Sequence, residues 1–171
     1  TDRKISCILP VHTWGNICDV PSLKDYINKR EIIISIVEDA SESLGSKISV
    51  KENDIHSGTL GDFGVISFNG NKIITAGGGG IILTNNQKKA EEAKHLISQA
   101  KKDPIRYVHD KVGFNYGLTN IQAALGLGQF KNLESFIKRK QEIHKFYNKE
   151  ISNINGLSIL EAPENCTSNY W

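Results

Sequence analysis

The residues best suited to covalent chemistry in this 171-residue sequence are a lysine and a serine in one short tract. Ser67 and Lys72 bound the tract SFNGNK, and the glycine run 77–80 follows shortly after it. A lysine amine attacks aldehydes when burial or nearby cations favour its neutral form. A serine hydroxyl beside small-residue loop amides suits a phosphate group. A lysine in such a loop is more often a solvated residue, so the tract alone leaves both interpretations open.

A carboxylate stands at a second position of interest. Asp39 lies in the tract VEDASE (37–42), directly after the apolar run Ile32–Val37. In open α/β sheets, ligands bind beyond the carboxyl ends of the strands. Asp39 could therefore hold a cationic partner in a site, or it could simply cap the following turn.

Histidine and cysteine spacing favours no metal site and no disulfide framework. None of the five histidines has metal-ligand spacing, so each is expected to be a packing or surface residue. The three cysteines are scattered and odd in number, which predicts a reducing, cytoplasmic environment. These residues are His12, His56, His95, His109 and His144, with Cys7, Cys18 and Cys166.

Overall composition narrows the function classes. The net charge is only +2, which argues against a nucleic-acid-binding face. No apolar run approaches the ~20 residues that a membrane-spanning helix needs. The sequence contains no methionine. We therefore expect an internal piece of a longer polypeptide, whose isolated form would leave apolar surface open.

The first elements predict a mostly parallel α/β sheet with flanking helices. Residues 5–9 form an apolar run that ends at Pro10, and residues 22–30 have helical spacing after Asp19. The β-branched run Ile32–Val37 suits a strand that is covered on both faces. Strand, helix and strand in this order make a βαβ unit.

The later elements are predicted from similar patterns. We expect strands at 65–68, 73–74 and 81–83, and a helix from Asn86 that ends by Pro104. A second helix is expected from 119 to 151. The sequence becomes extended and turn-rich after Asn155 and Gly156, so residues 1–151 would be part of a large domain, and residues 152–171 the truncated start of a small C-terminal domain. The expected buried stripe of the second helix is Leu125, Phe130, Leu133, Ile137, Ile143 and Tyr147.

Together, several short tracts resemble one family, the DegT/DnrJ/EryC1/StrS sugar aminotransferases, which depend on pyridoxal 5'-phosphate. The tracts occur in the family's order and at its spacing over nearly the whole chain. The resemblance implies the type I aminotransferase fold. The tracts are PVH (10–12), VEDASESLG (37–45), GDFG (61–64), SFNGNK (67–72), GGG (78–80), GFNY (113–116), QAALG (122–126) and Gln129.

The resemblance also implies roles for individual residues. Lys72 would condense with the cofactor aldehyde and carry a proton during the reaction. Asp39 would pair with the pyridine nitrogen, and Ser67 would bind the cofactor phosphate. Asn115 would reach the phosphate from the neighbouring subunit of a homodimer. Glu42 stands where many relatives carry glutamine near the ring hydroxyl, so it would have to be protonated or paired.

Two departures refine the resemblance. The glycine run 77–80 replaces the common G-E-G-G, and Gly117 stands where arginine often follows the Asn-Tyr pair. The tract NGNK (69–72) together with the all-glycine run resembles the branch that aminates UDP-linked 4-keto-6-deoxy-N-acetylhexosamines for bacillosamine or legionaminic acid, with glutamate as amino donor, in bacterial surface glycan biosynthesis. Two alternatives stay open: a non-catalytic or regulatory member of the fold, and an α/β nucleotide-binding domain without pyridoxal phosphate.

Overall fold

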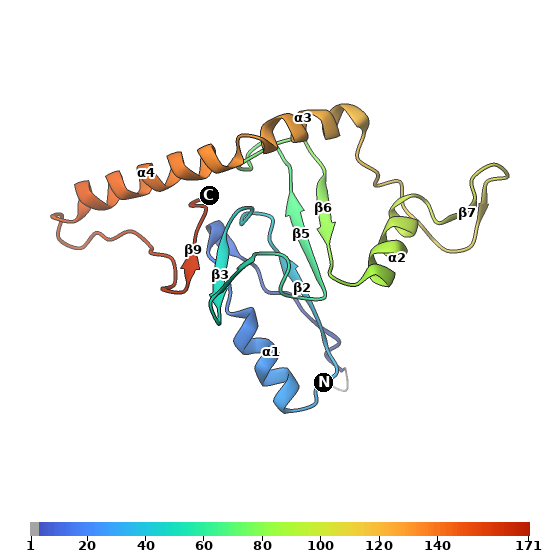
Figure 1. The fold of residues 1–171 in the computed structure, drawn as a ribbon, viewed down its shortest axis with the longest axis horizontal. Coiled ribbons are helices and arrows are strands. Elements are labelled where there is room, and N and C mark those ends of the chain that lie inside the picture. The colour runs from blue at the N-terminus through green and yellow to red at the C-terminus, as the bar shows by residue number, and fades with distance from the viewer. Residues whose placement is uncertain (1–3) are drawn as a thin grey trace.

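A four-stranded sheet organises the molecule in a computed structural model that describes residues 4–171 (Figure 1). Its strand order is β1 (Cys7–Ile8), β2 (Ser35–Asp39), β5 (Phe63–Ser67) and β6 (Gly80–Leu83). The first three strands are parallel, and β6 is antiparallel to β5. The predicted α/β class is confirmed.

Helix α1 (Val20–Lys29) connects β1 to β2 and completes the predicted βαβ unit. Asp19 caps it, since its Oδ1 accepts a hydrogen bond from the Ser22 amide at 3.0 Å. Pro21 occupies the first turn, where its missing N–H costs nothing. The buried hydrophobic core lies beneath this helix and consists of Ile17, Val20, Ile27, Ile36, Ile48 and Leu60.

A second, antiparallel sheet returns the end of the chain to this core. Its order is β4 (Asn53–His56), β3 (Lys47–Val50) and β9 (Cys166–Thr167). Just beyond β9, Asn169 is fully buried, and its amide donates to Ser46 Oγ at 2.9 Å. Residues 165–169 thus pack on the first third of the chain. The assignment of residues 152–171 to a second domain stays a prediction.

The remaining elements extend outward from the sheets. A short 3-10 turn, Thr13–Gly15, precedes α1. One arm, which projects on the β6 side, contains α2 (Gln87–Ile97) and the hairpin of β7 (Lys101–Asp103) with β8 (Val108–His109) (Figure 1). Helix α3 (Asn120–Phe130) lies over the carboxyl end of β5. Helix α4 (Leu133–Ile151) continues from it on the side away from the arm (Figure 1).

Two predicted strands are corrected. The run at 32–37 enters its strand only at Ser35, because the Ile32 amide bonds the Ile27 carbonyl and belongs to the last turn of α1. Its faces also differ, since Ile36 and Glu38 are buried while the alternate positions are partly exposed. Residues 73–74 form no strand. They lie in a loop that folds back on Phe68.

The helix predicted from Asn86 ends earlier than Pro104. Helix α2 stops at Ile97, and Gln99 and Ala100 adopt positive φ angles of 71° and 50°. The Ala100 amide then bonds the His95 carbonyl at 2.8 Å, which satisfies a carbonyl of the last turn.

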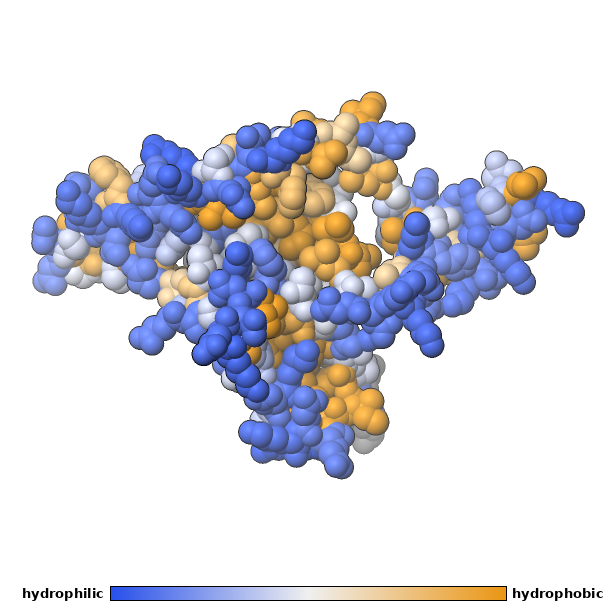
Figure 2. All heavy atoms as spheres, in the orientation of Figure 1, coloured by the Kyte–Doolittle hydropathy of each residue, from blue (hydrophilic) through white to orange (hydrophobic). Residues whose placement is uncertain are grey.

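The second predicted helix is two helices, and its expected buried stripe is wrong. The break falls at Lys131 and Asn132, and asparagine favours such helix ends. No side chain of α3 or α4 is buried, and Leu125 and Phe130 are 47% and 54% exposed. Figure 2 shows hydrophobic side chains gathered around α3 and the sheet below it. The stripe has the predicted spacing, but the described residues cover it only in part: Leu133 and Ile137 are half-buried, whereas Leu125 and Phe130 stay exposed.

Two whole-chain properties complete the description. No helix among residues 4–171 is long and apolar enough to cross a membrane. Within the same residues, no three histidine, cysteine or acidic side chains gather as a metal site would require.

Candidate active site

The carboxyl ends of β2 and β5 place two predicted site residues on one face of the sheet. Asp39 ends β2 and is paired in register with Val65, and Ser67 lies two residues further along β5. Side chains two apart on a strand share a face, and so do directly paired residues. Asp39 and Ser67 therefore lie on the same face, at the edge where parallel strands bind ligands.

Asp39 has the local contact that its capping interpretation predicted. Its Oδ1 accepts a hydrogen bond from the Ser41 amide at 3.1 Å. Its main chain is held on both sides, since its amide donates to the Pro10 carbonyl and its carbonyl accepts from the His12 amide, each at 2.9 Å. The carboxylate is thus fixed at the strand end.

Lys72 is not a solvated loop residue. Its side chain is only 12% exposed, and its Nζ lies 3.7 Å from Glu42 Oε1. The same Nζ stands 4.7 Å from the centre of the Trp171 ring, within the range of a cation–π contact. Glu42 Oε2 accepts from the Trp14 amide at 2.8 Å. The predicted need for a partner of Glu42 is met by the lysine and this amide.

The loop that carries Lys72 is folded against the end of β5. The Lys72 amide donates to the Asn69 carbonyl at 3.1 Å, which closes a turn. Thr75 binds the loop at two points, because its hydroxyl donates to the Phe68 carbonyl and its amide donates to Gln129 Oε1 of α3. Helix α3 therefore supports the lysine loop through the glutamine that the sequence singled out.

Glu38, next to Asp39, is a fully buried and fully satisfied carboxylate. Its Oε2 contacts His12 Nε2 at 2.8 Å and the Gly58 amide at 3.0 Å. Its Oε1 accepts from the amides of Leu60 and Gly61 at 2.6 and 2.5 Å. Burial alone would raise the pKa of Glu38, but the hydrogen bonds from His12 and the amides hold it below its usual value.

His12 is a packing histidine, as predicted, and its hydrogen bonds define its tautomer. The Cys18 amide donates to Nδ1 at 3.1 Å, so Nδ1 carries no proton. Nε2 therefore bears the hydrogen of the neutral ring and donates it to Glu38.

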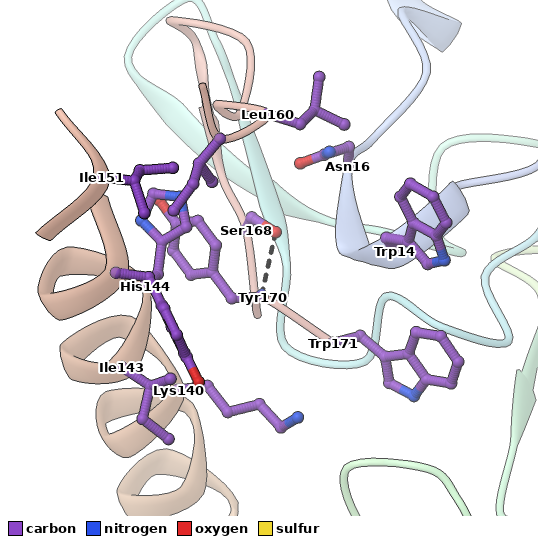
Figure 3. Close-up of a pocket in the computed structure, with 12 residues that line it drawn as sticks. Trp14, Asn16, Lys140, Ile143, His144, Ile151, Leu160, Ser168, Tyr170 and Trp171 are labelled. Carbon is purple, nitrogen blue, oxygen red and sulfur yellow. Dashed lines mark hydrogen bonds between the residues drawn. The ribbon is translucent and has the colours of Figure 1, made fainter. Parts of the chain in front are cut away.

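A groove adjoins the lysine on the side of α4. Figure 3 shows Trp14 and Trp171 on one side and His144 and Tyr170 on the other, where the last two rings stack at 4.0 Å. Within the described part of the chain, the indole Nε1 of Trp171 is buried and has no hydrogen-bond partner. The groove is thus lined by aromatic and aliphatic side chains, and Trp171 separates it from Lys72.

A comparison with known protein families shows which family this chain matches. All of residues 1–171 match the DegT/DnrJ/EryC1/StrS aminotransferase family. The chain belongs to that family. Its members are pyridoxal-phosphate-dependent aminotransferases of nucleotide sugars, which favours the predicted cofactor over the alternative of a nucleotide-binding domain without it.

Individual relatives agree with the family match. The GDP-perosamine synthases of Escherichia coli O157:H7 and Vibrio cholerae are 34% and 31% identical over 169 and 170 residues, 99% of this chain in each case. The crystal structure of the aminotransferase TlmJ from Streptoalloteichus hindustanus superposes with a TM-score of 0.85 at 26% identity, over 96% of this chain. A DegT/DnrJ/EryC1/StrS aminotransferase from Brucella abortus gives 0.84 at 25% identity, also over 96%.

The chain is shorter than these family members. It spans 44% of the length of both GDP-perosamine synthases, 44% of TlmJ and 42% of the Brucella protein.

Asn115 lies apart from the other predicted site residues. It is exposed and forms an isolated β-bridge with Ser98, at the end of α2. The structure therefore groups Asp39, Glu42, Ser67 and Lys72 at the sheet edge and leaves Asn115 on the projecting arm. Its contribution to a neighbouring subunit stays a prediction.

Sequence reasoning missed three features of the site. Trp14 and Trp171 flank Lys72 although 157 positions separate them, and no local pattern links them. Glu38 was passed over because the strand was expected to end at Val37. Its even spacing from the buried Ile36 was the available indication of an inward-facing side chain.

Proposed function

We propose that this chain carries the cofactor-binding and catalytic residues of an aminotransferase that acts on a nucleotide-linked 4-keto-6-deoxy sugar. The observation that carries the proposal is the buried amine of Lys72, paired with Glu42 at the sheet edge where Asp39 and Ser67 share a face. A largely buried lysine beside a carboxylate and an aromatic ring is unusual for a loop and typical of a site.

The side chains present fit pyridoxal phosphate chemically. Lys72 offers an amine for its aldehyde, Asp39 a carboxylate for its pyridine nitrogen, and Ser67 a hydroxyl for its phosphate. The loop around the lysine is open, because a Cβ built at Gly70 or Gly77 would have no atom within 4 Å. These residues are the ones that would hold the cofactor.

Each of these site residues has a separate role in the proposed reaction. When bound, the cofactor supplies an electron sink that stabilises negative charge on the substrate carbon. Asp39 holds the proton on the ring nitrogen, Ser67 orients the phosphate, and Lys72 moves a proton to and from the carbon that bears the amine. Glu42 and Trp171 keep the lysine amine directed into the site.

The finer assignments belong to the same proposal. We assign glutamate as amino donor, C4 of the sugar as acceptor and a homodimer in which Asn115 completes the partner's site. We assign UDP as the nucleotide because the glycine run 77–80 resembles that of the UDP-sugar branch of the family. GDP is the second candidate, because two relatives at 31–34% identity are named GDP-perosamine synthases, whereas the UDP-sugar transaminase of Campylobacter jejuni is 29% identical.

The lysine assignment is tested with Lys72→Ala in the protein as its gene encodes it. We expect the near-ultraviolet or visible absorbance that pyridoxal phosphate acquires on covalent attachment to disappear in the variant. The matched control is Lys89→Ala, since Lys89 also pairs with a carboxylate, Asp62, and lies 5.6 Å from an aromatic ring. An absorbance band that persists in Lys72→Ala would disprove the assignment.

The substrate assignment is tested by supplying glutamate with UDP-, GDP- and dTDP-linked 4-keto-6-deoxy sugars and measuring 2-oxoglutarate. The UDP sugar is expected to give the highest kcat/KM. A preference for the GDP sugar would overturn the nucleotide assignment alone. Cofactor binding without transfer to any sugar would indicate a non-catalytic member of the family.

A further inference from the structure

Two adjacent carboxylates of β2 lie on opposite faces of the sheet. Strand alternation directs Asp39 to the face that it shares with Ser67, and Glu38 to the buried side. The proposed chemistry uses Asp39 and gives Glu38 no part. A buried carboxylate is costly to desolvate even when it is hydrogen-bonded, so its presence calls for another explanation.

Glu38 and His12 close a ring of contacts around the Asp39 main chain. The His12 amide donates to the Asp39 carbonyl at 2.9 Å, while the His12 ring donates to Glu38 at 2.8 Å. The Asp39 amide donates to the Pro10 carbonyl of the same segment. Both hydrogen-bonding groups of the Asp39 main chain therefore depend on a segment whose ring is held by Glu38.

The glycine-rich loop 57–64 fixes Glu38 from the other side. Gly58 has a φ of +79°, and a Cβ at Gly61 would lie 2.7 Å from the Ile36 carbonyl oxygen. Only residues without a Cβ let this loop approach β2 closely enough for three amides to reach the carboxylate. Glu38 thus joins the loop and the 10–12 segment to the strand that ends in Asp39.

We propose that Glu38 and His12 are positioning residues that fix the Asp39 carboxylate opposite the ring nitrogen of the cofactor. The inference rests on the proposed function, since it presumes that Asp39 meets that nitrogen. A carboxylate held through its main chain on both sides has little freedom to drift, and a displacement of about 1 Å in such a group is costly to catalysis.

Glu38→Gln tests this without changing the size of the side chain. Both carboxylate oxygens of Glu38 accept two hydrogen bonds, and glutamine must place an NH2 group against one pair of donors. We expect the 10–12 segment or the 58–61 loop to shift, and Asp39 with it.

The measurements use protein stripped of cofactor and reconstituted with pyridoxal phosphate that carries 15N in the ring. In the wild type, the 15N chemical shift is expected to report a protonated nitrogen at neutral pH. In Glu38→Gln, the unprotonated fraction should rise and the Kd for the cofactor should increase by roughly tenfold, as expected for loss of one charge-assisted hydrogen bond. The absorbance band that depends on Lys72 should persist.

Asp62→Asn is the matched control. Its carboxylate also binds the main chain of β2, where Oδ2 accepts from the Ile36 amide at 2.9 Å, and it pairs with Lys89. We expect this variant to lose stability without any change in the 15N shift. An equal change in both variants would show that the effect is general loosening of the strand and would overturn the inference.

A second variant covers the case in which Glu38→Gln does not fold. His12→Leu removes the two ring contacts, with Glu38 and with the Cys18 amide, and leaves three amides on Glu38. It should change the 15N shift in the same direction. A wild-type shift and Kd in either folded variant would refute the positioning role while the Lys72 band stands. Failure of Lys72→Ala to remove that band would instead refute the proposed function.

Discussion

Around Glu38 the chain buries a charge and satisfies every contact that it needs, whereas along α3 and α4 it leaves apolar side chains exposed. The first region contains the core of α1, β2 and β3, together with the fully buried His12 and Glu38. The second has no buried side chain at all among its described residues. The first region is thus packed within this chain, while the second has the exposed apolar pattern that is typical of a surface covered by another protein segment.

The largest effect expected from this comparison follows from removing the buried charge. Glu38→Ala leaves His12 and three amides without their acceptor, so we expect a loss of about 3–5 kcal/mol in the free energy of unfolding. Leu125→Ala, on α3, should change it by less than about 0.5 kcal/mol. Equilibrium urea unfolding measures both, and equal losses would show that the two regions are packed alike.

Identical glycine substitutions should act with opposite sign in the two regions. A Cβ at Gly64 would lie 2.0 Å from the Gly58 carbonyl oxygen, so Gly64→Ala should cost roughly 1–3 kcal/mol. Gly128 in α3 has no atom within 4 Å of its Cβ position, so Gly128→Ala should gain about 1 kcal/mol through helix propensity. Thermal unfolding of both variants tests this. A stabilised Gly64→Ala would contradict the close packing of loop 57–64.

The smallest expected effect is on the loss of stability at acidic pH. The hydrogen bond from Lys89 is the main cause that lowers the pKa of Asp62, and bonding from the Ile36 amide adds to it. A carboxylate whose pKa is lower in the folded state contributes stability above its unfolded pKa, and that contribution is lost as pH falls through the folded value. Because this pair is more than one-third exposed, the contribution should stay under about 1 kcal/mol.

The measurement is the urea midpoint between pH 7 and pH 3 in wild type and Asp62→Asn. The acid slope should be shallower in the variant, and an unchanged slope would contradict the assignment.

Local patterns were enough to predict the start of α1 and the strands β5 and β6. Asp19 and Pro21 predicted the start of α1, and the apolar tracts predicted β5 and β6, because capping and strand burial depend on neighbouring residues. The tract around Lys72 predicted a site at a strand end, and the structure gives that lysine a buried environment.

Contacts between distant segments were beyond such patterns. The burial of Glu38 requires loop 57–64 to fold back on β2, and the cover of Lys72 requires Trp171 to return from the other end of the chain. The exposure of Leu125 depends on what packs outside the described residues rather than on its own spacing. A period of 3.6 shows which face is apolar and cannot show what covers it.

The docking of residues 169–171 beside Glu42 and Lys72 has a consequence for the order of folding. Asn169 binds the carbonyl of Glu42 from 127 positions away, and Trp171 lies on Lys72. Contacts between residues so far apart in the sequence form late, because the entropic cost of closing a long loop comes before the contacts can stabilise the fold. A ribosome-bound intermediate that has already folded α1 and its core would still present an uncovered lysine. The amine should therefore be most open to reagents and free aldehydes during synthesis, before residues 169–171 dock beside it.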